Sequence, residues 1–184
     1  KTAYGQGIAD EFRKRARQLK AEVVCFEGIT EGDRDFSPVL TKVRALRPDG
    51  IYFGGMYPEG ALLIRQARSL GIGARFIVGD GCFDPELVKI GDRAVEGTII
   101  TFLAPPWEEH ESARAFVRKY TARYGPVKSY APLAYDAANI VIDAIEKAKA
   151  RTRRGVNDVL KSASYSFSGV VGLTKFEPNG DVVG

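Results

Sequence analysis

Residues 50–81 read GIYFGGMYPEGALLIRQARSLGIGARFIVGDG, and this stretch decides the fold class. Two short apolar runs, residues 51–53 and 76–78, each end at glycine, which is typical of buried strands followed by a sharp turn. Between them, Pro58 suits the first turn of a helix whose apolar side chains recur at helical spacing until Gly71 stops it. The stretch therefore predicts a strand–helix–strand unit with parallel strands.

The same alternation continues on both sides of this unit. On the N-terminal side we expect helices over residues 8–19 and 36–46, with a strand over residues 21–26 between them. On the C-terminal side we expect a short helix over residues 85–90 and a strand over residues 97–103. Strands that alternate with helices predict an α/β fold, a flavodoxin-like three-layer arrangement with a parallel sheet between helices.

The pattern changes after Pro105 and Pro106. Two long helices are expected over residues 111–124 and 132–150, a third over residues 156–162, and a β segment over residues 169–176. Consecutive helices without intervening strands cannot complete a doubly wound sheet, so we predict a domain crossover near residues 102–106. The domains are then residues 1–101, an incomplete α/β lobe, and residues 102–184, a mainly helical segment.

The composition indicates a globular chain and excludes several partners. Of 184 residues, 45% are hydrophobic and 27% charged, with a net charge of +4, so the chain can bury a core. The basic cluster at residues 151–154 has no interleaved aromatic residues, and we interpret it as a solvated helix end rather than a nucleic-acid site. No apolar run approaches the roughly 20 residues of a membrane span, and no signal peptide is present.

Motifs for catalysis, metals or nucleotides are weak. Cys25 and Cys82 lie far apart without CxxC spacing, so a metal site is not indicated, while a disulfide between them stays open. His110 is the single histidine and lies in an acidic run, which leaves too few ligands for a metal and no convincing triad. The G-x-G at Gly5 and Gly7 lacks a third glycine and a Walker lysine. We therefore expect no enzyme activity, no cofactor and no metal.

Ligands of an open parallel sheet bind outside the carboxyl ends of its strands. The stretch RFIVGDGCF places Asp80 at such an end, between Gly79 and Gly81. Asp80 either caps the helix that begins near Asp84 or faces a cleft as an acceptor for a cation. We favour the cleft, because Asp84 already stands as a cap before Pro85. The side chains expected around a small ligand at these ends are Tyr4, Thr30, Met56, Tyr57 and Asp80.

Seven segments carry a resemblance to a known family. In chain order they read TAYGQGIADEF, FEGITEGDRDFSPVLTKVR, GIYFGGMYPEGALLIRQARSLGI, FIVGDG, AVEGTIIT, SYAPLAYDAANIVIDAIEKA and GLTKFEPNGDVVG. Together they resemble the type I periplasmic binding proteins, and most closely the leucine/isoleucine/valine-binding receptors of branched-chain amino acid ABC transporters. The resemblance covers essentially the whole chain.

The resemblance implies a particular domain plan. Members of the family have two α/β lobes that close on a ligand by hinge motion. On that plan, residues 1–101 correspond to most of the second lobe, and residues 102–184 correspond to the segment that returns to the first lobe. The chain then resembles an internal part of a longer receptor, which would account for the absent signal peptide and for the absence of a strand before Tyr4.

The resemblance also implies a function and site roles. The expected protein is a periplasmic or extracellular receptor that captures a branched-chain amino acid and delivers it to a transporter permease. The alternative is a regulatory domain of the same fold that senses an amide, urea or an aromatic acid. Tyr4 would cover the ligand, Asp80 would bind its α-ammonium group, and Tyr130 would lie at the cleft edge. Met56 stands where related receptors often have an aromatic residue.

Two further expectations follow from the resemblance to only part of a two-lobed receptor. The groups that hold the ligand carboxylate in this family belong to the first lobe's N-terminal half, outside this chain, so the chain alone should bind weakly. Open sheet edges and uncovered apolar helices favour association with a second copy. The alternatives for this association are a homo-oligomer and a strand-exchanged dimer.

Overall fold

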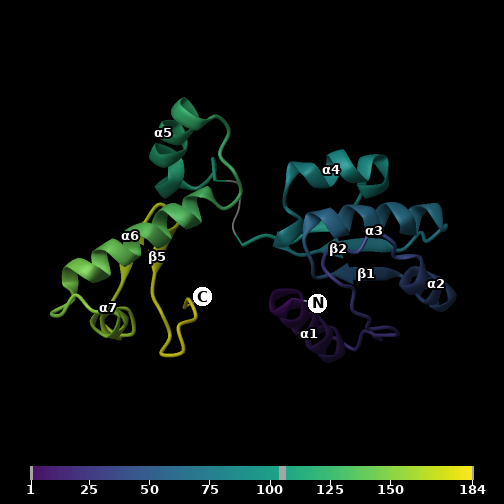
Figure 1. The fold of residues 1–184 in the computed structure, drawn as a ribbon, viewed down its shortest axis with the longest axis horizontal. Helices are drawn as coiled ribbons and strands as arrows, with labels where there is room; N and C mark the ends of the chain where they lie inside the picture. Colours follow the sequence, from purple (N-terminus) through teal and green to yellow (C-terminus); the bar gives the residue numbers. More distant parts are fainter. Residues whose placement is uncertain (1, 104–106, 184) are drawn as a thin grey trace. The chain divides into compact units, whose positions relative to one another are not determined.

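The structure is a computed structural model that describes residues 2–103 and 107–183. Its contacts divide the chain into two units, Lys1–Leu103 and Ala104–Gly184, which are described separately below and are labelled in Figure 1. Unit 1 contains α1 (Ala3–Gln18), α2 (Ser37–Leu46), β1 (Gly50–Phe53), α3 (Tyr57–Ser69), β2 (Arg75–Val78), α4 (Pro85–Gly91) and β3 (Ile99–Ile100), with short 3-10 turns η1 (Asp80–Cys82) and η2 (Asp92–Val95).

A three-stranded parallel sheet organises unit 1. Its order is β1-β2-β3, and β1 pairs with β2 in the register Ile51 to Phe76 and Phe53 to Val78. The strand–helix–strand unit predicted from residues 50–81 is confirmed, with α3 as its crossover helix. The α/β fold class is confirmed as well.

Side chains alternate between the two faces of the sheet, as the period of a strand requires. Ile51 and Phe53 pack against the core that α3 and α4 cover, and Phe76 and Val78 in β2 are fully buried there. Tyr52 points to the other face, where it meets α1. Figure 1 shows α1 on the opposite side of the sheet from α3 and α4, which gives three layers.

The strand predicted over residues 21–26 is wrong, because the structure has no regular element there. In the flavodoxin-like strand order, the strand after the first helix pairs with the strand before it. The sheet of unit 1 consists of β1, β2 and β3, and no strand among the described residues pairs with residues 21–26. They are held through side chains instead, since the Arg13 guanidinium lies 4.0 Å from the centre of the Phe26 ring.

Unit 2 is mainly helical, as predicted. It contains η3 (Glu111–Ala113), α5 (Arg114–Tyr124), α6 (Ala131–Lys147) and α7 (Arg153–Leu160), and then the strands β4 (Phe167–Gly169) and β5 (Gly172–Thr174). The β segment predicted over residues 169–176 is an antiparallel hairpin of β4 and β5. The prolines at 105 and 106, used to predict the crossover, lie outside the described residues.

A buried carboxylate joins the hairpin to α6. Asp136 is 2% exposed, and its two carboxylate oxygens accept hydrogen bonds from the backbone N–H groups of Val170 (3.0 Å) and Val171 (2.8 Å). Gly169 must lack a side chain, because a Cβ there would lie 2.2 Å from an Asp136 oxygen. The turn between β4 and β5 is therefore fixed by one side chain of α6.

One face of α6 is apolar and exposed within unit 2. Ile140 and Ala144 are buried, whereas Val141 and Ile145, which follow the same helical spacing in the sequence, are exposed. Tyr135 and Ile142 add to this exposed apolar face. Among the residues that the structure describes, no helix combines the length and apolar character needed to cross a membrane.

Candidate functional site

Three chain segments meet at the carboxyl ends of β1 and β2. The Tyr4 hydroxyl, in the first turn of α1, donates a hydrogen bond of 2.6 Å to Oδ1 of Asp80. The same hydroxyl accepts a hydrogen bond of 3.1 Å from the backbone N–H of Gly81. The loop after β2 is thus tied to the start of α1, where a ligand of an open parallel sheet is expected.

The glycines of these loops permit a close approach. A Cβ on Gly81 would lie 2.8 Å from the carbonyl oxygen of Gly55 and 2.8 Å from Sδ of Met56, so a larger residue would push the loops apart. A Cβ on Gly5 would lie 2.6 Å from the carbonyl oxygen of Gly54. The backbone of residues 5, 54, 55 and 81 and the sulfur of Met56 therefore pack closely together, next to the Tyr4 hydroxyl.

The charge of Asp80 acts on its neighbours. Burial, followed by the hydrogen bond to Asp80, raises the pKa of Tyr4 to about 12. Burial and then the charge of Asp80 raise the pKa of Tyr52 above its ordinary value. Burial and the charges of Asp80 and Glu59 raise the pKa of the Cys82 thiol to about 12. Tyr4, Tyr52 and Cys82 are therefore neutral at ordinary pH.

Helix capping at α4 belongs to a different residue. Asp84 is the N-cap of α4, and its carboxylate accepts a hydrogen bond of 2.8 Å from the backbone N–H of Glu86. The Asp80 side chain instead meets Tyr4. The structure therefore agrees with the prediction that Asp84, and not Asp80, caps the helix α4.

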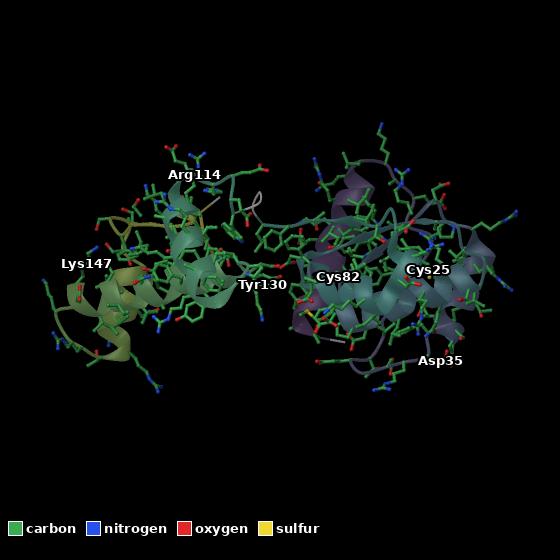
Figure 2. The ribbon with its side chains drawn as sticks, turned by 90° about the horizontal axis from the view of Figure 1, so that it is seen from above. Cys25, Asp35, Cys82, Arg114, Tyr130 and Lys147 are labelled. Carbon is green, nitrogen blue, oxygen red and sulfur yellow. The ribbon has the colours of Figure 1, made fainter. Side chains whose placement is uncertain are left out.

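Three of the residues predicted for the site lie together in unit 1. Tyr4, Met56 and Asp80 come together, and Tyr4 and Met56 are 38% and 47% exposed. Tyr57 is the first residue of α3 and packs against the core of unit 1. Tyr130 belongs to unit 2, where it immediately precedes α6 (Figure 2).

Tyr52 is a neighbour of Asp80 that the sequence analysis did not single out. Its hydroxyl lies 3.6 Å from the position that a Cβ on Gly79 would occupy, so it borders the loop that carries Asp80. The alternation of side chains along a strand could have identified Tyr52, because it places this residue on the face of the sheet opposite Ile51 and Phe53. The backbone N–H of Thr30, another residue expected at these strand ends, donates a hydrogen bond of 2.8 Å to the carboxylate of Asp33.

The two cysteines are both free thiols, which settles the question of a disulfide between them. Cys82, labelled in Figure 2, is fully buried in unit 1. Its Sγ lies 3.5 Å from the carbonyl oxygen of Gly55. With a raised pKa, its thiol has little thiolate character and is chemically inert. Within residues 2–103 and 107–183, no group of three or more His, Cys, Asp or Glu side chains could hold a metal ion.

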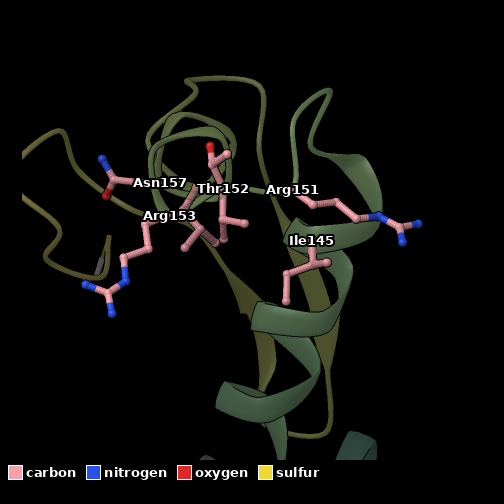
Figure 3. A pocket seen from close by; sticks show the side chains of 7 residues that line it. Ile145, Arg151, Thr152, Arg153 and Asn157 are labelled. Atoms are coloured by element: carbon pink, nitrogen blue, oxygen red, sulfur yellow. The ribbon is translucent and has the colours of Figure 1, made fainter.

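A cavity of about 450 Å³ lies in unit 2, at the C-terminal end of α6 and the start of α7. Figure 3 shows the guanidinium groups of Arg151 and Arg153 extending away from each other, so they do not converge on an anion. This agrees with the interpretation of residues 151–154 as a solvated helix end, and all four are exposed. The cavity is lined by Ile145, Arg151, Thr152, Arg153, Val156, Asn157 and Leu160.

Comparison with known proteins gives consistent matches over almost the whole chain. The sequence model of a family described as periplasmic binding protein matches residues 1–183. A Leu/Ile/Val-binding protein homolog 2 of Brucella abortus is 34% identical over 181 residues, which cover 98% of this chain and 48% of the relative. A leucine-, isoleucine-, valine-, threonine- and alanine-binding protein of Pseudomonas aeruginosa is 32% identical over 183 residues, which cover 99% of this chain and 48% of the relative.

Solved structures agree. The leucine binding protein LivK from Thermotoga maritima matches with a TM-score of 0.87 and 34% identity, over 99% of this chain and 52% of that one. The branched-chain amino acid transporter substrate binding protein LivJ from Streptococcus pneumoniae, solved in complex with isoleucine, matches with a TM-score of 0.74 and 27% identity, over 100% of this chain and 56% of that one. The chain therefore spans about half the length of the proteins it matches.

Proposed function

The chain belongs to the periplasmic binding protein family, and from this premise we propose that it supplies the ammonium-binding side of a receptor for a branched-chain amino acid. The observation that carries the proposal is the Asp80 carboxylate, which lies at the carboxyl ends of β1 and β2 and is bonded to Tyr4. A carboxylate beside the neutral side chains of Tyr4 and Tyr52, at this edge of a sheet, favours a cationic ligand group.

Charge and size limit what this site can do by itself. A hydrogen bond between an ammonium group and a carboxylate contributes roughly 1.5–3 kcal/mol. Micromolar affinity requires about 8 kcal/mol, so other contacts must supply most of the binding free energy. Met56, half-exposed and flexible, is suited to contact an apolar side chain of variable shape. Groups that hold the ligand carboxylate would complete the receptor.

The names of the relatives support the choice of ligand. Proteins described as binding leucine, isoleucine and valine match this chain along nearly all of its length. We propose an extracytoplasmic location, a binding rather than a catalytic role, and delivery of the ligand to the permease of an ABC transporter. In this plan unit 1 forms most of one lobe, and unit 2 contributes Tyr130 at the cleft edge.

The proposal is tested by removing the charge of Asp80. Isothermal titration calorimetry with L-leucine, L-isoleucine and L-valine is performed on the polypeptide produced from its complete gene. Asp80→Asn should weaken binding by about tenfold or more, which corresponds to about 1.4 kcal/mol. Asp84→Asn is the matched control, because it removes the same charge four residues away and asparagine still caps a helix well.

If Asp80→Asn binds these amino acids with unchanged affinity, Asp80 does not bind the ammonium group of the ligand. Binding of an amide, urea or an aromatic acid, with no response to the three amino acids, would instead favour the regulatory sensor of the same fold. The complete gene provides a second test, because an export signal in it would fit a transport receptor whereas a helix-turn-helix would fit a regulator.

A further inference from the structure

We propose that Tyr4 is a positioning residue that acts through Asp80, and that the two side chains together select cations that carry N–H donors. This role differs from the one that the family resemblance implies for Tyr4, which is to cover the ligand. The inference rests on the proposed function, because it concerns the same site.

The hydrogen-bonding capacity of the Tyr4 hydroxyl carries the first step. A phenolic hydroxyl has one donor hydrogen and two acceptor lone pairs. Its hydrogen is donated to Asp80 over 2.6 Å, and one lone pair accepts the Gly81 N–H over 3.1 Å. Tyr4 can therefore offer a ligand only an acceptor. A ligand carboxylate or carbonyl would find no donor on the Tyr4 hydroxyl or on the Asp80 carboxylate, whereas an ammonium group finds acceptors on both.

The rigidity of the surroundings carries the second step. Thr2 caps α1 by accepting a hydrogen bond from the Gly5 N–H, and Gly5 lies directly against the carbonyl oxygen of Gly54. The first turn of α1, which carries Tyr4, is thus held against the loop after β1. The Tyr4 hydroxyl then fixes both the side chain of Asp80 and the backbone of the next residue, Gly81.

A carboxylate oriented before the ligand arrives binds more tightly, because its rotamer freedom is not lost on binding. The raised pKa of Tyr4, about 12, keeps the hydroxyl protonated and able to donate to Asp80 across the usual pH range. If Tyr4 acts on the ligand only through Asp80, its contribution to ligand affinity should disappear when Asp80 is replaced by a residue without a carboxylate.

A double-mutant cycle tests this dependence, with L-leucine as the probe and calorimetry as the measurement. Tyr4→Phe keeps the ring and should weaken leucine binding by about fivefold, the effect of losing one hydrogen bond. In the Asp80→Asn background, Tyr4→Phe should change the affinity by less than about twofold. Losses that multiply would mean that Tyr4 contacts the ligand independently of Asp80, and an unchanged affinity in the single variant would also overturn the proposal.

A second probe tests the selection of donors. N,N,N-trimethyl-leucine keeps the positive charge but carries no N–H donor, so it should bind the wild-type protein about tenfold or more weakly than leucine. Equal affinities for leucine and N,N,N-trimethyl-leucine would contradict the selection of N–H donors. The positioning role of Tyr4 would then be judged from the double-mutant cycle alone.

Hydrogen exchange separates this inference from the proposed function. In the ligand-free protein, Tyr4→Phe should speed exchange of the Gly81 amide by about tenfold, because that N–H loses its acceptor. Tyr124→Phe is the control and should leave Gly81 unchanged, since Tyr124 is an exposed residue of α5 in unit 2. A wild-type protein that binds no leucine would refute the proposed function, and unchanged Gly81 exchange in Tyr4→Phe would refute the positioning role whether or not leucine binds.

Discussion

The ring of Phe12 in α1 stacks on the ring of Tyr52 in β1, with centroids 4.1 Å apart and planes 5° apart. This contact attaches α1 to the face of the sheet opposite α3. It also determines where the first turn of the helix lies, and so where the Tyr4 hydroxyl meets Asp80. The site therefore depends on a packing contact two helical turns away.

Removing this stack should loosen α1. Phe12→Ala is expected to lower the free energy of unfolding by about 1–2 kcal/mol, less than for a fully buried phenylalanine because Phe12 is 38% exposed. Urea denaturation followed by circular dichroism measures the change. Leu19→Ala, at the exposed end of the same helix, should have an effect below about 0.5 kcal/mol. Equal effects of the two substitutions would contradict the importance of the stack.

Asp136 should be the most sensitive position in unit 2. Asp136→Ala leaves two backbone N–H groups of the β4–β5 turn without their acceptor, at a cost of about 2–4 kcal/mol. Asp136→Asn keeps one carbonyl acceptor and should cost less. Urea denaturation of both variants checks the order, and an alanine variant as stable as the asparagine variant would show that the hairpin does not need this carboxylate.

Stability should fall at high pH. The pKa of Tyr4 is raised from 10.0 to about 12 in the folded chain, so folding favours its neutral form. The corresponding stability is fully present below pH 10 and is lost as the pH rises toward 12, because the unfolded chain releases the proton first. Tyr165 behaves in the same way, through burial and its hydrogen bond to Asp143.

Thermal melting across this alkaline range measures the loss. Tyr4→Phe has no proton to release and should lose less stability than the wild type between pH 10 and 12. Ultraviolet absorbance should show Tyr4 among the last tyrosines to ionise. Parallel loss of stability in the wild type and in Tyr4→Phe would show that Tyr4 ionises normally.

The exposed apolar face of α6 should promote association of the 184-residue chain. Val141, 47% exposed on this face, is replaced by lysine, and Val88, 61% exposed on α4, is replaced by lysine as the control. Light scattering with size-exclusion chromatography should show a mass that rises with concentration, reduced by Val141→Lys and unaffected by Val88→Lys. A monomer at every concentration would count against association.

The family assignment and the fold class could be read from the sequence because their signals are local. The glycines that end residues 51–53 and 76–78, and the helical spacing between Pro58 and Gly71, each act within a few residues. The position of Asp80 at the end of a strand follows from the same pattern. Asp84 was recognised as a cap for the same reason, because it lies directly before Pro85.

Predictions that needed a partner distant in sequence were less successful. Residues 21–26 have the composition of a strand, but a strand forms only where a neighbour accepts its hydrogen bonds. Val141 and Ile145 follow the helical period, yet period alone does not show which side of a helix is covered, and both are exposed. The roles of Met56, Tyr57 and Tyr130 in ligand binding stay predictions.

Sequence patterns were enough to predict that an acid stands between two glycines at the end of a buried strand, and that helices and strands alternate around it. Tertiary structure alone decided the partner of that acid. The Tyr4 hydroxyl reaches Asp80 across 76 residues of chain because α1 packs on β1 through Phe12 and Tyr52. A contact of this kind depends on how helix and sheet pack in space, and local sequence patterns carry no information about it.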